Sequence, residues 1–129
     1  MFIGNGVSEL IDLTLRALLN RGDEVLLPSP DYPLWTAATV LNDGRPVHYP
    51  CRPEAGWVPD PDEIESLIPP RTRALLVINP NNPTGAGYPR EVLERIARNA
   101  EKQHLVVFSD ESYDGLTDED VEHVPMASL

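Results

Sequence analysis

The stretch that decides the fold is Arg73-Ala-Leu-Leu-Val-Ile78, followed at once by Asn79-Pro-Asn-Asn-Pro-Thr-Gly85. The first part is a continuous apolar run after Arg73, which is typical of a strand that a parallel sheet buries on both faces. The second part holds three amides, two prolines and a glycine in seven residues, which predicts a stiff polar turn. The loop therefore lies at the carboxyl end of a buried strand, where open parallel sheets bind their ligands.

On both sides of this stretch the chain alternates predicted helices with short apolar strands. Helices are expected over Ser8–Asn20, Pro33–Leu41 and Pro89–Gln103, with a further helix that begins after Asp60. Strands are expected over Glu24–Leu27, Arg45–Tyr49, Arg73–Ile78 and Leu105–Phe108, the last one fully buried. This alternation predicts an α/β fold, a three-layer sandwich built on a mostly parallel sheet.

Turn and cap residues delimit these elements. Ser8 is a candidate N-cap for the first helix, and Asp60 followed by Pro61 has the pattern of a helix start. The proline-rich segment 50–60 is expected to be an irregular surface connection. The acidic run Asp118–Glu122 is expected to be a solvated loop.

Composition excludes several classes of partner. The 129 residues carry 21 acids and 10 bases, a formal charge of −11, which disfavours nucleic acid and anionic membranes. No apolar run approaches the roughly 20 residues of a membrane span, and no basic leader precedes an apolar stretch. The single cysteine, Cys51, cannot form an internal disulfide, which fits a reducing cytoplasm. The three histidines are widely spaced, so we expect no metal site.

A dinucleotide-binding turn is the alternative for the start of the chain. Gly4-x-Gly6 precedes a predicted helix, and the acids Asp23 and Glu24 follow near the expected distance. However, Glu9 stands where the third glycine of that fingerprint allows close packing of the helix. The two acids also begin a strand, whereas a ribose-binding acid ends one. The pattern therefore disfavours a dinucleotide site.

The heptapeptide Asn79–Gly85 resembles the Asn-Pro-x-Asn-Pro-Thr-Gly motif of class I/II aminotransferases, the fold-type I pyridoxal-phosphate enzymes. The resemblance covers the whole chain in order. Within the family, Gly4–Leu10 (Gly-Asn-Gly-Val-Ser-Glu-Leu) and Pro30–Trp35 (Pro-Asp-Tyr-Pro-Leu-Trp) are most similar to bacterial alanine aminotransferases. The resemblance implies pyridoxal 5′-phosphate as cofactor, an alanine-like amino acid and a 2-oxo acid as substrates, and a homodimeric parent enzyme.

The resemblance also implies a set of cofactor-binding residues. Gly6, Val7 and Ser8 look like the phosphate-binding turn, where free backbone amides and the positive end of the helix dipole meet a phosphate. Tyr32 looks like the aromatic residue that covers the pyridine face, with Trp35 as the alternative.

Three further residues complete this set. Asn82 and Tyr113 look like the pair that binds the phenolic oxygen, and Asp110 like the acid that faces the pyridine nitrogen. A carboxylate at that position keeps the nitrogen protonated, so that the ring withdraws electrons from the substrate carbon. Because Asp110 follows a predicted buried strand, an unpaired charge there would be costly and a cationic partner is expected.

Aminotransferase chemistry also needs a lysine that bonds covalently to the cofactor. The only lysine is Lys102, near the end of a predicted helix and at the amino end of the last strand, away from the expected site. The resemblance implies that the reactive lysine lies in a Ser-x-x-Lys segment beyond the Asp110–Tyr113 region, and residues 1–129 contain no such segment.

We therefore expect residues 1–129 to be a partial cofactor-binding large domain without the family's amino-terminal arm, catalytic-lysine segment and small domain, and inactive by itself. Two other interpretations stay open. One is a piece of a related enzyme of the same fold, such as a carbon–sulfur lyase, and the other is a non-catalytic remnant that persists as an associating module.

Overall fold

The structure is a computed structural model that describes residues 3–116 and 123–129. One parallel sheet of four strands has the order β2-β1-β3-β4. The strands are β1 (Glu24–Ser29), β2 (Arg45–Pro50), β3 (Thr72–Ile78) and β4 (Val106–Asp110). The helices are α1 (Val7–Leu18), α2 (Pro33–Leu41), α3 (Pro61–Ser66) and α4 (Arg90–Lys102), with short 3₁₀ turns at Pro53–Ala55 and Met126–Ser128.

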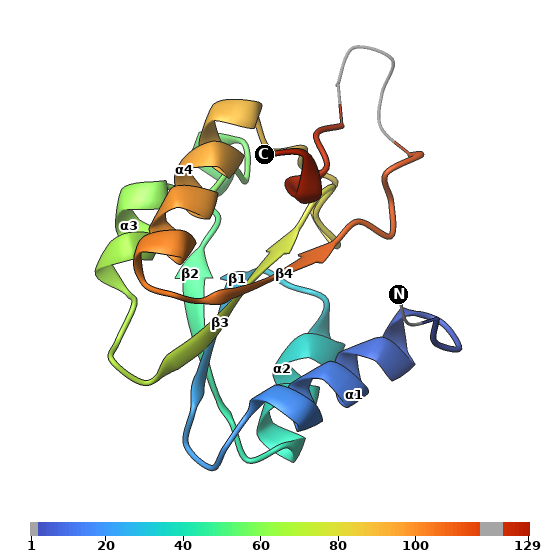
Figure 1. Ribbon diagram of the computed structural model, residues 1–129. Coiled ribbons are helices and arrows are strands. Elements are labelled where there is room, and N and C mark those ends of the chain that lie inside the picture. Colours follow the sequence, from blue (N-terminus) through green and yellow to red (C-terminus); the bar gives the residue numbers. More distant parts are fainter. Residues whose placement is uncertain (1–2, 117–122) are drawn as a thin grey trace.

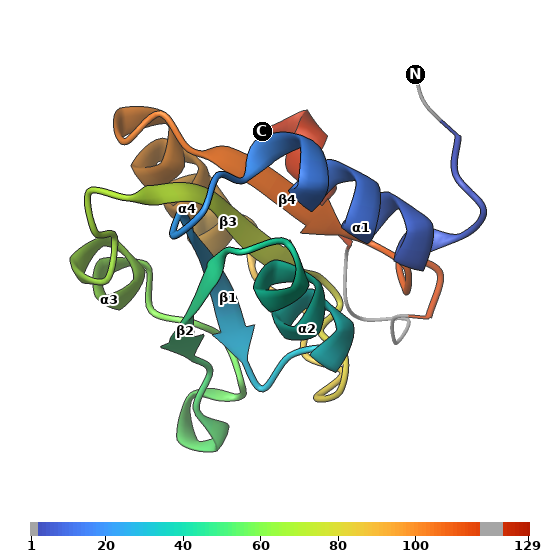
Figure 2. The same cartoon turned by 90° about the horizontal axis from the view of Figure 1, so that it is seen from below.

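Helices cover both faces of the sheet. Figure 1 shows α3 and α4 side by side on one face, and Figure 2 shows α1 and α2 together on the other. Each face has its own hydrophobic core. Leu26, Leu75 and Ile96 belong to the core under α3 and α4, and Ile11, Leu15 and Leu76 to the core under α1 and α2. Full burial of one such side chain stabilises the fold by about 1.5–3 kcal/mol. The predicted three-layer α/β sandwich is confirmed.

The elements read from apolar periodicity are confirmed with bounds shifted by two residues or fewer. The helix predicted over Pro33–Leu41 is α2 with the same bounds, and the strand predicted over Arg73–Ile78 is β3, which begins at Thr72. Asp60 caps α3 as expected, because its side chain accepts a hydrogen bond of 2.9 Å from the Asp62 amide. The bounds of these elements depend on residues close in the sequence, which is why the sequence alone predicts them.

The expectation that Ser8 caps the first helix is wrong. The N-cap of α1 is Gly6, and no side chain caps the helix, so Ser8 is its second residue. Gly6 has φ 83°, in the left-handed region that favours glycine, and this backbone turn places the N-cap two residues earlier than the serine pattern indicated. The Glu9 carboxylate instead accepts a hydrogen bond of 2.6 Å from the Asn5 amide.

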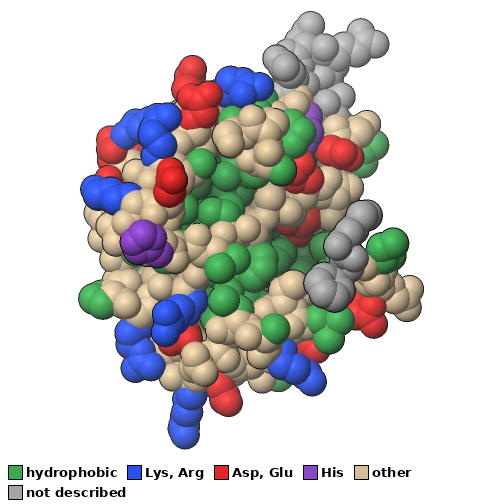
Figure 3. Space-filling view, viewed as in Figure 1, with side chains coloured by type: hydrophobic (Ala, Val, Ile, Leu, Met, Phe, Trp, Pro, Cys, Tyr) green, Lys and Arg blue, Asp and Glu red, His purple; other side chains and the backbone are tan. Residues whose placement is uncertain are grey.

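The expectation that the last strand is fully buried is also wrong. Within the described part of the chain, β4 pairs with β3 alone, so it lies at the edge of the sheet. Val106 is 43% exposed, whereas Leu75 at the centre of β3 is fully buried. Figure 3 shows the molecule from the side seen in Figure 1. Hydrophobic side chains gather at the centre of the visible surface, and charged side chains lie around its rim. An edge strand lacks the neighbour that would cover it, so its apolar composition does not ensure burial.

The connection 50–60 is irregular as predicted, except for the turn Pro53–Ala55 and one bridge between Cys51 and Pro59. The acidic run Asp118–Glu122, expected to be a solvated loop, lies outside the described residues. Among the described residues, no helix is long and apolar enough to cross a bilayer.

Candidate functional site

The two polar clusters predicted at the carboxyl edge lie next to each other. Strands β3 and β4 pair in parallel with Ile78 opposite Asp110, so that both strands end at the same level of the sheet. The Asn79 amide donates a hydrogen bond of 3.0 Å to the Asp110 carbonyl oxygen and extends the pairing by one residue. The loop after β3 and the turn after β4 therefore leave the sheet side by side.

Buried amides hold the loop Asn79–Gly85 in place. The Asn79 side-chain oxygen accepts a hydrogen bond of 2.8 Å from the Tyr88 amide, and Asn81 Nδ2 donates one of 3.2 Å to the Tyr88 hydroxyl. Both asparagines are buried. The peptide bonds before Pro80 and Pro83 are cis. Asn82, the third amide, faces away from this network and donates a hydrogen bond of 3.2 Å to the Tyr113 hydroxyl.

Asp110 is the buried acid of the site, with 7% of its surface exposed. Its Oδ2 accepts a hydrogen bond of 3.0 Å from Trp35 Nε1. Its Oδ1 accepts one of 2.6 Å from Ser112 Oγ and one of 3.3 Å from the Ser112 amide. Among the described residues, no arginine, lysine or histidine nitrogen lies within 4.0 Å of this carboxylate. The donors that the described residues offer to this carboxylate are therefore all neutral.

A cavity of about 130 Å³ joins most of the predicted site residues. Its walls come from α1, the loop before α2, the end of β3, and the segments that follow β3 and β4. It is lined by Val7, Tyr32, Ile78, Asn82, Asp110, Ser112 and Tyr113. Five of the seven predicted residues thus meet at one place, although they come from four separate parts of the sequence.

Gly6 and Ser8 are not in the wall of this cavity, but they flank Val7, which is. Both are exposed at the amino end of α1, where the first helical amides have no partner within the helix. The position of Val7 brings the positive end of the α1 dipole to the rim of the cavity. The predicted turn therefore lies beside the cavity, within reach of an anionic group on a ligand that fills it.

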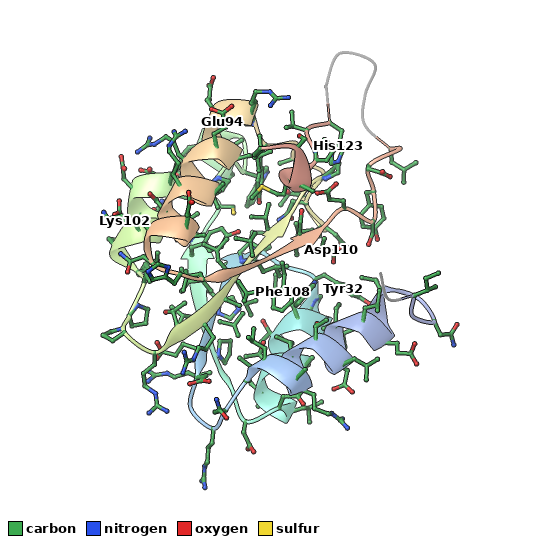
Figure 4. The ribbon with its side chains drawn as sticks, viewed as in Figure 1. Tyr32, Glu94, Lys102, Phe108, Asp110 and His123 are labelled. Carbon is green, nitrogen blue, oxygen red and sulfur yellow. The ribbon has the colours of Figure 1, made fainter. Side chains whose placement is uncertain are left out.

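Of the two aromatic candidates for the ring face, Tyr32 lines the cavity and Trp35 does not. Trp35 is 4% exposed and packs against Phe108, with ring centroids 5.5 Å apart. Figure 4 shows Tyr32, Phe108 and Asp110 near one another at the gap between β4 and the helix pair below it. The hydrogen bonds from Trp35 and Ser112 to Asp110 were not predicted from the sequence. The available signal was that a buried indole N–H needs an acceptor.

Glu111, the residue after Asp110, links the end of β4 to the last described segment. Its carboxylate accepts hydrogen bonds of 2.7 Å from Ser109 Oγ and 3.0 Å from the Met126 amide, and it lies 3.0 Å from His123 Nε2. Burial raises the pKa of Glu111, but the bonds from Ser109, His123 and Met126 outweigh burial and the pKa is lowered. Glu111 is therefore held in its charged form beside the site.

Lys102 lies far from this cavity, as predicted. It ends α4 and its Nζ is 2.6 Å from Glu65 Oε1 of α3. Figure 4 shows Lys102 and Asp110 at opposite ends of β4. A side chain paired at the amino end of the strand cannot reach a ligand at the carboxyl end.

The fold and this geometry define an α/β protein with a cavity at the carboxyl edge of a parallel sheet, the place where such sheets bind their ligands. The family model for aminotransferase class I and II matches residues 1–128, and the chain belongs to that family. It is 54% identical to the alanine aminotransferase of Mycobacterium tuberculosis over all 129 of its residues, which are 30% of that relative. It is 53% identical to the glutamate-pyruvate aminotransferase AlaA of Escherichia coli, with 100% of this chain and 32% of the relative covered.

A solved structure agrees with the sequence comparison. An aminotransferase from Escherichia coli superposes with a TM-score of 0.94 at 53% identity, over 96% of this chain and 31% of that one. The chain thus spans about a third of the length of the relatives that it matches.

Proposed function

We propose that this chain supplies most of the non-covalent pyridoxal 5′-phosphate site of an aminotransferase. The reaction moves an amino group between an alanine-like amino acid and a 2-oxo acid. The observation that carries the proposal is the cavity that gathers Tyr32, Asn82, Asp110 and Tyr113 at the carboxyl edge of the sheet. The names of the relatives support the choice of alanine and of a 2-oxo acid such as pyruvate as substrates.

The donor set fits the cofactor at the pyridine nitrogen. Asp110 is buried and the described residues offer it no cationic partner, although an unpaired buried charge is costly. A protonated pyridine nitrogen in the cavity would be that partner. Asp110 would then hold the proton on the nitrogen, and Tyr32 would cover one face of the ring. When bound, the cofactor supplies an electron-withdrawing ring that stabilises negative charge at the substrate carbon.

The other ends of the cofactor have matching groups. Asn82 Nδ2 and the Tyr113 hydroxyl, 3.2 Å apart, would both bind the phenolic oxygen. Gly6, Val7 and Ser8 would bind the phosphate with the free amides at the start of α1. Each of these groups would therefore bind a different part of the cofactor.

The extent of the domain is part of the same proposal. Residues 1–129 form part of the large domain of a longer, homodimeric and cytoplasmic enzyme, and the arm, the reactive lysine and the small domain are supplied by other segments. The 129-residue chain alone does not transfer amino groups, because its one lysine, Lys102, is paired with Glu65 on the far side of the sheet. The charge of −11 disfavours binding of nucleic acid and of anionic membranes.

A titration with pyridoxal 5′-phosphate tests the proposal. Cofactor absorbance and quenching of tryptophan fluorescence would be followed in the 129-residue chain and in the variants Asp110→Asn and Asp114→Asn. Loss of a charge partner is expected to weaken binding by about thirtyfold in Asp110→Asn. Asp114→Asn, which changes an exposed acid of the turn after β4, is the matched control and should bind normally. Equal affinity of wild type and Asp110→Asn, or no binding by the wild type, would refute the site.

A further inference from the structure

The Asp110 carboxylate lies between two cavities. One is the cavity of about 130 Å³ described above, and the other, of about 200 Å³, lies between α1 and β4. Val7, Asp110 and Ser112 line both. Tyr32 lines only the first cavity and Trp35 only the second. Tyr32 and Trp35 therefore lie in the walls of different cavities, and Trp35 contacts Asp110 through its indole N–H.

Both oxygens of the carboxylate are fixed by protein donors. Trp35 Nε1 donates to Oδ2 over 3.0 Å, and Ser112 Oγ donates to Oδ1 over 2.6 Å. Trp35 is a rigid donor, because its ring is 4% exposed and packs against Phe108. Its position on α2 links the helix that follows Tyr32 to the acid at the end of β4.

The chemistry of the indole decides what this bond can do. An indole N–H donates and never accepts, so it stabilises a carboxylate oxygen that offers a lone pair. An ionised carboxylate has about four lone-pair sites. The described residues use three of them, through Trp35 Nε1, Ser112 Oγ and the Ser112 amide. One site is left for a further donor, and the other three bonds hold the carboxylate in one orientation.

We propose that Trp35 is a positioning residue that aims the remaining lone pair of Asp110 at the pyridine nitrogen. This inference rests on the function proposed above. Trp35 does not touch the cofactor in this arrangement, and it acts through Asp110 alone. The family resemblance pointed to Trp35 only as the alternative ring that covers the pyridine face, and the structure gives it a different role.

Two ligands that differ only in the ring nitrogen separate this role from a structural one. The probes are pyridoxal 5′-phosphate and its 1-deaza analogue, in which C–H replaces the nitrogen. Trp35→Phe keeps an aromatic ring against Phe108 but removes the donor. We expect the affinity of Trp35→Phe for pyridoxal 5′-phosphate to fall about tenfold, as for loss of a hydrogen bond to a charged group, and its affinity for the analogue to stay at the wild-type value.

Trp57→Phe is the matched control, since Trp57 lies after the turn Pro53–Ala55 and lines neither cavity. It should bind both ligands as the wild type does. The double variant Trp35→Phe/Asp110→Asn should bind no more weakly than Asp110→Asn alone, because Trp35 acts through the acid. An equal loss for both ligands, or no loss for either, would overturn the proposal.

A measurement on the wild-type chain does not depend on whether Trp35→Phe folds. The protein has two tryptophans, so ¹⁵N labelling gives two indole N–H signals. Pyridoxal 5′-phosphate should shift the Trp35 signal more than the 1-deaza analogue does, and should leave the Trp57 signal unchanged. Identical shifts with both ligands would contradict the role of Trp35 while leaving the cofactor site standing. If neither ligand bound the wild type, the proposed function would fall, and this inference with it.

Discussion

Asn82 Nδ2 donates a hydrogen bond of 3.2 Å to the Tyr113 hydroxyl and so joins the loop after β3 to the turn after β4. Both side chains line the cavity of the candidate site. The pair is exposed to solvent, so its own contribution to stability is small. In the function proposed above, both side chains bind the phenolic oxygen of the cofactor.

We expect Asn82→Ala and Tyr113→Phe each to weaken binding of pyridoxal 5′-phosphate by about fivefold to tenfold, the loss of one hydrogen bond. The free energy of unfolding should change by less than about 0.5 kcal/mol in either variant. Cofactor titrations and urea unfolding measure the two quantities. The control is Asn42→Ala, at the end of α2 and outside the cavity. If the fold loss of cofactor affinity in the double variant equals the product of the two single fold losses, the two residues act on the cofactor independently.

Ser8 carries the prediction for the phosphate turn. Ser8→Ala should weaken binding of pyridoxal 5′-phosphate by about threefold to tenfold and leave the affinity for pyridoxal, which lacks the phosphate, unchanged. The reason is that Ser8 lies in the first turn of α1 beside the cavity, where an anion meets the helix dipole. Equilibrium titration with the two compounds makes the comparison. A parallel loss of both affinities would place Ser8 at the ring and not at the phosphate.

Lys102 should not form a covalent bond with the cofactor. After borohydride reduction of the 129-residue chain with pyridoxal 5′-phosphate, we expect no modified Lys102 in the mass spectrum of its tryptic peptides. Its ammonium group is paired with Glu65 at the amino end of β4, on the far side from Asp110. Because this pair is exposed, Lys102→Ala should change stability by no more than about 1 kcal/mol. A stoichiometric adduct at Lys102 that disappears in Asp110→Asn would refute the assigned geometry.

We expect the protein to lose stability at alkaline pH because Tyr49 and Tyr88 are buried. Burial raises the pKa of Tyr49 well above its usual value, and Tyr88 and Cys51 raise it further. Burial and Cys51 also raise the pKa of Tyr88, against a smaller lowering by Asn81. A raised folded-state pKa gives stability that is complete below the unfolded pKa of about 10 and declines as the pH rises above it.

Urea midpoints at pH 8, 9.5 and 10.5 would show this decline, and it should be less steep in Tyr49→Phe. That variant should also lose about 1 kcal/mol at pH 8, because the Tyr49 hydroxyl donates a hydrogen bond of 2.7 Å to the Leu76 carbonyl oxygen. The same slope in wild type and variant would mean that Tyr49 does not contribute to the alkaline transition.

The sequence predicted the fold because its signals are local. The apolar run 73–78 and the helix over Pro33–Leu41 are each specified by their own residues, and strand ends in a parallel sheet meet at one edge. Asn82 and Asp110 could therefore be placed close together before the structure was known. Their roles toward the cofactor stay predictions, and the experiments above test them.

What could not be predicted depends on distant neighbours. The bond from Trp35 to Asp110 joins residues 75 positions apart and depends on how α2 is rotated against the sheet. The exposure of β4 depends on its place at the sheet edge, which its apolar residues do not encode. The start of α1 depends on the left-handed conformation of Gly6. The sequence does not reveal this conformation, and Ser8, two residues later, has the stronger preference for an N-cap.

The burial of Cys51 makes this thiol a reporter of opening motions. Burial raises the pKa of Cys51 and outweighs the lowering by the hydrogen bonds of Tyr88 and Ser29, so the reactive thiolate is scarce in the folded chain. The thiol lies in the core under α3 and α4. A maleimide or disulfide reagent can reach it only when α3 and α4 separate from the sheet, so the labelling rate, divided by that of the unfolded chain, gives the free energy of that opening.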